Sequence, residues 1–100
     1  MRFDTGITDI ATAGTQVRIS NTKDKVLWIE FKAPSANSGI TYVGLSDVSS
    51  TNGYPLYASG GDDAKLILDF QRLGGTIEFS KIWIDAASSG DDVAWAVVLL

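Results

Sequence analysis

The sequence predicts an all-β fold: a single small β-sandwich or jelly-roll-like barrel of about seven to eight strands. Turn-forming clusters recur roughly every eight to twelve residues, and the apolar segments between them alternate inward and outward positions. The chain has 100 residues, of which 45% are hydrophobic, so it fits one domain and is too apolar for a disordered chain. We expect residues 1–12 to form an N-terminal arm or an edge strand, and residues 13–100 to form the sandwich.

The first half of the chain carries the clearest alternation. Around residues 15–20, Val17 and Ile19 are expected to point inward. A turn then leads into residues 26–32, which have one aliphatic face and one face with two charges that are costly to bury. The aliphatic face therefore belongs to the core, and Trp28 points outward. That inward face consists of Leu27, Ile29 and Phe31.

The second half continues the strand pattern. Pro55 cannot donate a ladder hydrogen bond, so its segment belongs at a sheet edge. Residues 64–70 fit a strand or a helical turn, and we favour the strand because a lone helix would need its own binding surface. In residues 82–85 the isoleucines face inward and Trp83 faces outward. The final segment, residues 93–100, is apolar on both faces, as expected for a central strand.

The composition argues against most kinds of chemistry. The chain lacks histidine and cysteine, so the commonest general base and the usual zinc ligands are missing. Two acidic pairs, Asp62–Asp63 and Asp91–Asp92, lie in turns without the spacing that wraps a calcium ion, and we interpret them as solvated turn residues. Serines lack a base and a nucleophile-elbow motif. We therefore expect no enzyme activity, no metal and no cofactor.

The charge distribution limits the possible partners. The chain has 8 basic and 12 acidic residues, giving a net charge of −4, and the basic residues are scattered rather than gathered on one face. We therefore expect no nucleic-acid partner. No segment approaches the roughly 20 apolar residues that cross a bilayer, so we expect no membrane partner.

Exposed apolar side chains are the strongest functional signal. Trp28 and Trp83, if outward on neighbouring strands, would form a patch of the kind that marks an interaction site. Phe3 and Ile7 lie in an N-terminal segment with too little pattern to fold alone. We predict that these four residues make contacts with a partner or between copies of the chain. Stacking on sugar rings is the alternative use of the same tryptophans.

The strand and turn pattern resembles small structural proteins of tailed bacteriophages, in particular capsid decoration (cement) proteins and related virion β-sandwich modules. The resemblance covers about three quarters of the chain, and residues 59–63 depart from it where a proline–glycine turn is expected. It implies a compact β-sandwich on the outer surface of a virion, assembled as a homo-oligomer, a dimer or trimer. The segments that carry the resemblance are residues 13–20, 26–34, 37–44, 48–56 and 82–86.

These observations lead to one functional expectation and two alternatives. We expect a non-enzymatic protein, made in the host cytoplasm, that decorates and stabilises a bacteriophage capsid through oligomeric contacts with the major capsid protein. A carbohydrate-binding β-sandwich module and a tail or head-completion component of the virion are the alternatives.

Overall fold

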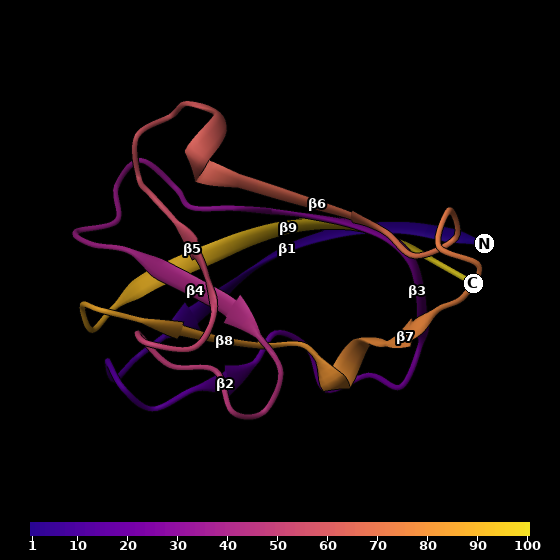
Figure 1. The fold of residues 1–100 in the computed structure, drawn as a ribbon, viewed down its shortest axis with the longest axis horizontal. Helices are drawn as coiled ribbons and strands as arrows, with labels where there is room; N and C mark the ends of the chain where they lie inside the picture. The colour runs from indigo at the N-terminus through magenta and orange to yellow at the C-terminus, as the bar shows by residue number, and fades with distance from the viewer.

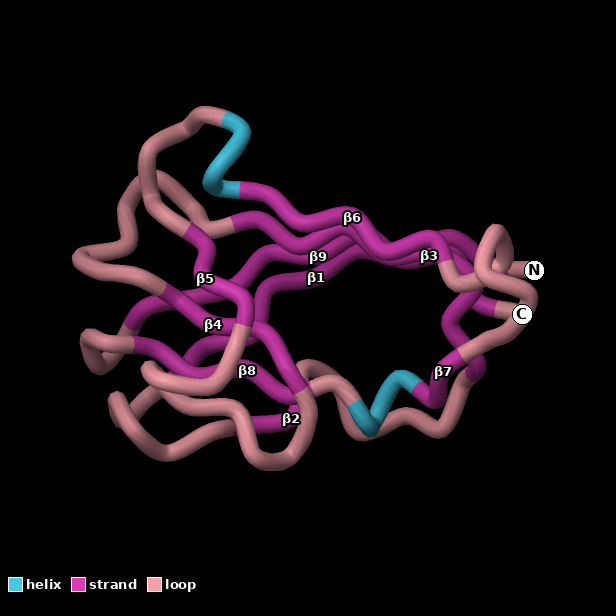
Figure 2. Tube along the Cα trace, viewed as in Figure 1, coloured by secondary structure: helices cyan, strands magenta, loops and turns pink.

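The computed structural model describes residues 1–100 and confirms the all-β fold. Figure 1 shows two layers of strands that face each other, and Figure 2 shows that the only helical segments are two single turns. The chain contains nine strands, slightly more than the seven to eight predicted, and three of them have only two or three residues each. The nine strands are β1 (Arg2–Ile10), β2 (Val17–Arg18), β3 (Lys25–Lys32), β4 (Thr41–Gly44), β5 (Tyr54–Leu56), β6 (Lys65–Asp69), β7 (Ile77–Glu78), β8 (Trp83–Ala86) and β9 (Asp91–Leu99), and the 3₁₀ turns are η1 (Asp62–Ala64) and η2 (Phe79–Lys81).

The two layers are separate antiparallel sheets. The first sheet has the strand order β1-β9-β3-β6, and β7 adds to the start of β3. The second has the order β2-β8-β4-β5. The N-terminal and C-terminal strands pair along their whole length, from Arg2 opposite Leu99 to Ile10 opposite Asp91, so both termini lie at the same end of the molecule (Figure 1). The N-terminal segment is thus an edge strand of the first sheet.

The core lies between the sheets because the inward faces of both are aliphatic. Fifteen buried hydrophobic residues form one cluster, drawn from the strands of both layers, from η2, and from Ile19, Ala33 and Ile82 next to these elements. Ile29 and Phe31 are fully buried in it, as predicted, and Ile84 faces them from the second sheet. Pro55 lies in β5 at a sheet edge, and residues 65–69 form a strand, both as predicted.

A bulge in β3 changes one predicted orientation. Val26 pairs with Leu99 and Trp28 pairs with Val98, so Leu27 is the extra residue between them. The bulge shifts the alternation by one position, and Val26 rather than Leu27 joins the core cluster. Leu27 is buried but lies outside that cluster. Beyond the bulge Trp28 points away from the core, as predicted.

Candidate functional site: an exposed apolar sheet face

The first sheet turns one face to the core and leaves the other uncovered. Residues directly opposite each other in antiparallel strands share a face, so the register defines the outer face without ambiguity. Four strands contribute three rows that run across the sheet. From β1 to β6, the first row is Phe3, Val98, Trp28 and Asp69, the middle row is Thr5, Ala96, Glu30 and Ile67, and the third row is Ile7, Ala94, Lys32 and Lys65.

This outer face is more apolar than a solvated sheet face needs to be. Phe3 is 66% exposed, Ile7 is 68% exposed and Ile67 is 53% exposed. Trp28 and Val98 are half-buried beside them. An antiparallel sheet with one solvated face normally carries polar residues there, so a face with these side chains is a candidate interaction surface.

Small side chains hollow the middle of the face. Ala94 and Ala96 stand on β9, the second strand from the edge, while the longer Glu30 and Lys32 stand beside them on β3. Together with Trp95, they line a depression of about 190 Å³. On β1, Ile7 stands opposite Ala94 and Phe3 stands opposite Val98, at the two ends of the alanine pair. The face therefore has both projecting apolar side chains and a recess that could receive one.

The charged residues of the face fall at one side and beyond one end. Glu30 and Lys32 lie on β3, and Asp69 and Lys65 lie on β6, so the three rows carry two acidic and two basic side chains. Beyond the third row, Asp9 stands directly opposite Asp92.

The position of Asp92 at this end of the sheet shifts its pKa. Burial raises the pKa of Asp92 above its usual value, and the neighbouring Asp9 and Asp91 carboxyls raise it further. Deprotonated Asp92 is therefore an unfavourable feature of the folded chain at neutral pH.

Three of the four predicted contact residues come together on this face. Phe3 and Trp28 share the first row, and Ile7 lies two rows away on β1. Trp83 does not join them, and the prediction of one patch containing both tryptophans is wrong. Trp83 belongs to β8, which pairs with β2 and β4 in the second sheet, so the two indoles lie on opposite outer faces of the sandwich.

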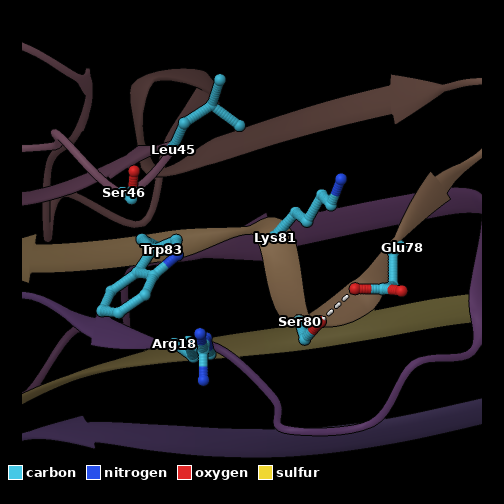
Figure 3. A pocket seen from close by; sticks show the side chains of 7 residues that line it. All are labelled: Arg18, Leu45, Ser46, Glu78, Ser80, Lys81 and Trp83. Carbon is cyan, nitrogen blue, oxygen red and sulfur yellow. Dashed lines mark hydrogen bonds between the residues drawn. The ribbon is translucent and has the colours of Figure 1, made fainter.

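Trp83 forms a separate small site on the second sheet. The guanidinium of Arg18, its cross-strand partner, lies 5.0 Å from the centre of the Trp83 ring, a cation–π contact. Figure 3 shows the two side chains beside a hollow of about 380 Å³, with Lys81 and Glu78 at its other end. The remaining lining residues are Leu45, Ser46 and Ser80.

Glu78 is held in its charged form within this hollow. Ser80 donates a hydrogen bond of 2.6 Å to the Glu78 carboxylate, which lowers the pKa of Glu78. Burial opposes the shift, and the charge of Lys81 adds to it. The hollow thus combines one aromatic ring with charged and hydroxyl groups.

A third recess was not predicted from the sequence. It is an apolar cleft of about 500 Å³ at the side of the sandwich where β6 faces β4 and β5. The alternation of Leu66, Leu68 and Phe70 is the one signal that could have indicated an unfilled inward face there. Its lining residues are Val43, Gly44, Leu45, Tyr54, Leu66, Leu68, Phe70, Ile77 and Ile82.

The acidic pairs differ from each other. Asp91 is only 4% exposed, and its two carboxylate oxygens accept backbone hydrogen bonds from Ser38 at 2.8 Å and Gly39 at 2.9 Å. Asp91 therefore anchors the loop before β4, and its interpretation as a solvated turn residue is wrong. Asp62 and Asp63 are exposed. The structure contains no group of three or more acidic side chains placed to hold a metal ion.

The fold and its surfaces define a small two-sheet β-sandwich with one apolar outer face. No protein-family model and no curated protein matches this chain. Among solved structures, it resembles a chain of the acid-stable capsid structure of Helicobacter pylori bacteriophage KHP30, with a TM-score of 0.51 and 12% sequence identity. The match covers 99% of this chain and 86% of that chain. At this identity the likeness establishes a shared fold. In addition, no helix here has the length and apolar character of a membrane span.

Proposed function

We propose that this protein is a non-enzymatic virion component that decorates and stabilises a bacteriophage capsid, through contacts among its own copies and with the major capsid protein. The observation that carries the proposal is the uncovered apolar face of the first sheet, with Phe3, Ile7 and Ile67 each more than half exposed. Such a face is an aggregation hazard in a free monomer and an asset in a protein that is covered in its assembly.

The fold likeness supports the phage setting. The similar chain comes from a phage capsid structure, and the match spans nearly the whole of this chain. A capsid component needs many modest contacts repeated by symmetry rather than chemistry at one point. Oligomeric binding then multiplies weak single contacts into stable attachment.

The test is cosedimentation of the purified protein with shells assembled from the major capsid protein of the same phage genome. Phe3→Lys and Ile7→Lys place a charge on the apolar face at exposed positions, so the fold is retained while shell binding falls about tenfold or more. Leu73→Lys is the matched control, because Leu73 is 80% exposed but lies in the turn after β6, outside the three rows. Absence of native protein from the shell pellet refutes the proposal, and so does equal binding by all three variants.

The Trp83 hollow favours a second candidate, a carbohydrate-binding module. An indole beside hydroxyl and charged groups is the combination on which sugar rings stack and hydrogen-bond. A glycan array with native protein and Trp83→Ala tests it. Saturable binding to a defined glycan that Trp83→Ala abolishes would favour this reading, whereas an empty array would exclude the glycans tested.

A further inference from the structure

We propose that the outer face of the first sheet pairs with the same face of a second copy, about a two-fold axis that runs across the strands through the middle row. The inference rests on the proposed function in taking this face as one that assembly covers. It goes further in naming the occupant and the symmetry, which follow from how charges and apolar side chains are distributed over the three rows.

The two-fold operation across the strands lays each strand antiparallel over the same strand of the partner. The first row of one copy then faces the third row of the other, and the middle row faces itself. The resulting contacts match apolar with apolar, aromatic with cation, and acid with base. They place Phe3 over the partner's Ile7, Val98 over the partner's Ala94, Trp28 over the partner's Lys32 and Asp69 over the partner's Lys65.

The other simple two-fold arrangement fits poorly. An axis parallel to the strands would lay β1 of one copy over β6 of the other. Phe3 would then face the partner's Asp69, and Ile7 would face the partner's Lys65. Those contacts bury apolar side chains against charged ones, and no acidic side chain faces a basic one. The axis across the strands is therefore favoured.

The charge balance of the face also permits self-association. The chain carries a net charge of −4, but the three rows carry two carboxylates and two ammonium groups. Within the three rows two copies can therefore approach without net repulsion, whereas the charges outside these rows sum to −4. The four charges lie on β3 and β6, so the β1 and β9 side of the interface remains apolar.

One contact is unfavourable and provides a test. Glu30 lies in the middle row, so the axis brings it close to the partner's Glu30. Lys32 stands two residues further along the same strand and reduces the repulsion without removing it. Removing this charge should therefore strengthen the pairing, which is the opposite of what most interface substitutions do.

The size of the face sets the strength of the pairing. Four strands and three rows at ordinary sheet spacings cover roughly 400 Å² per copy, about half of the roughly 800 Å² per partner in a stable complex. The pairing is therefore weak in dilute solution and becomes effective at high local concentration, as on the surface of a shell.

The experiment is sedimentation velocity of the full chain from about 1 µM to about 1 mM, with charge reversals on β6. Native protein shows a concentration-dependent dimer. Asp69→Lys and Lys65→Asp each place two like-charged pairs in the homodimer and weaken it about tenfold or more. An equimolar mixture of these two variants restores dimerisation, because in the mixed dimer every Lys again faces an acid. Glu30→Gln strengthens the dimer several-fold.

Controls separate pairing from folding. Asp69 accepts a hydrogen bond of 3.0 Å from the Arg72 backbone, so Asp69→Asn, which retains an acceptor, tests loss of charge without loss of the turn. Circular dichroism melting should be similar to that of the native chain for Lys65→Asp and Asp69→Asn, because both positions are exposed and asparagine keeps an acceptor for the Arg72 backbone. A native protein that stays monomeric over the whole range overturns the inference, and so does a mixture that dimerises no better than either variant alone.

The result is independent of the shell-binding assay. A protein that pairs in solution but never binds shells leaves the two-fold pairing standing and refutes the proposed function. A protein that binds shells but never pairs, at any concentration, refutes the two-fold pairing alone.

Discussion

Replacing Gly6 with alanine should destabilise the protein, because the indole of Trp95 lies directly over Gly6. The two residues are cross-strand partners on the inward side of β1 and β9. A Cβ built on Gly6 would stand 2.8 Å from Cη2 of Trp95 and 2.9 Å from Cε2, closer than real Cβ contacts. The ring must therefore move when the methyl group is added.

The ring is held on two other sides, so moving it has a cost. Nε1 of Trp95 donates a hydrogen bond of 3.1 Å to the Thr8 hydroxyl, and Phe79 packs edge-on with ring centres 5.1 Å apart. Overpacking costs about 1–3 kcal/mol, and loss of the hydrogen bond costs about 1 kcal/mol more. The better strand preference of alanine returns about 0.5–1 kcal/mol. The net loss is about 1–3.5 kcal/mol.

The assay is thermal unfolding followed by circular dichroism. In a domain of 100 residues each kcal/mol lowers Tm by about 5 °C, so a loss of about 1–3.5 kcal/mol lowers Tm by roughly 5–17 °C. Gly75→Ala is the matched control, since a Cβ there meets nothing within 4 Å. Adding Trp95→Phe to Gly6→Ala makes room for the methyl group, so the double variant should lose less than the sum of the singles. If Gly6→Ala melts like Gly75→Ala, the Trp95 ring moves aside without cost and the predicted destabilisation is wrong.

Three further substitutions test the polar contacts of the fold. Asp9→Asn removes a carboxyl that raises the pKa of Asp92. Because deprotonated Asp92 is unfavourable in the folded state, the variant should have a higher Tm than the native chain at pH 7. This gain in Tm should vanish below the ordinary Asp pKa of 3.8, where Asp92 is protonated in both the folded and the unfolded chain. A gain that stays constant from pH 7 to pH 3 would contradict this. Asp91→Asn weakens the two backbone hydrogen bonds that hold the loop before β4 and should cost about 1.5–3 kcal/mol in denaturant unfolding, with Asp62→Asn unchanged as the exposed control. Thr41→Val replaces a fully buried hydroxyl that has no partner in the protein and should stabilise the chain by about 1 kcal/mol; destabilisation would show that the hydroxyl is bonded.

Local alternation was sufficient to predict which side chains face outward, because it depends only on the two-residue period of a strand. The outward orientation of Trp28 and the inward orientation of Ile29 and Phe31 followed from the cost of burying the charges that neighbour Trp28. The apolar character of both faces of residues 93–100 identified β9 as a central strand. The bulge at Leu27 could not be predicted in the same way. It depends on how the end of β9 pairs with the start of β3, a contact between residues about 70 positions apart in the chain.

The composition of the site depended on the same long-range pairing. Phe3, Ile7 and Trp28 were predicted singly as outward or terminal residues, but the pairing of β1 and β3 with β9 is what gathers them on one face. Trp83 satisfied the same local rule and lies in the other sheet. Asp91 looked like its neighbour Asp92 in the sequence, and only the approach of the loop at residues 38–39 makes it a buried anchor.

The contact of Trp95 with Gly6 lies on the inward side of β1, and the apolar outer face includes the outward side of the same strand. A change in the stability of β1 should therefore also change the pairing of the outer face. Alternation sends Gly6 and Thr8 toward Trp95 while Phe3 and Ile7 point outward from the same β1. Thr8 also donates a hydrogen bond of 2.8 Å to the Ile19 carbonyl, which fixes the edge strand to the rest of the chain. A variant that loosens β1, such as Gly6→Ala, should therefore weaken pairing even though it adds nothing to the outer face. A variant that changes only the outer face, such as Ile7→Lys, should weaken pairing with its Tm unchanged. Comparing Gly6→Ala with Ile7→Lys therefore distinguishes loss of pairing caused by a destabilised β1 from loss of pairing caused by a changed contact surface.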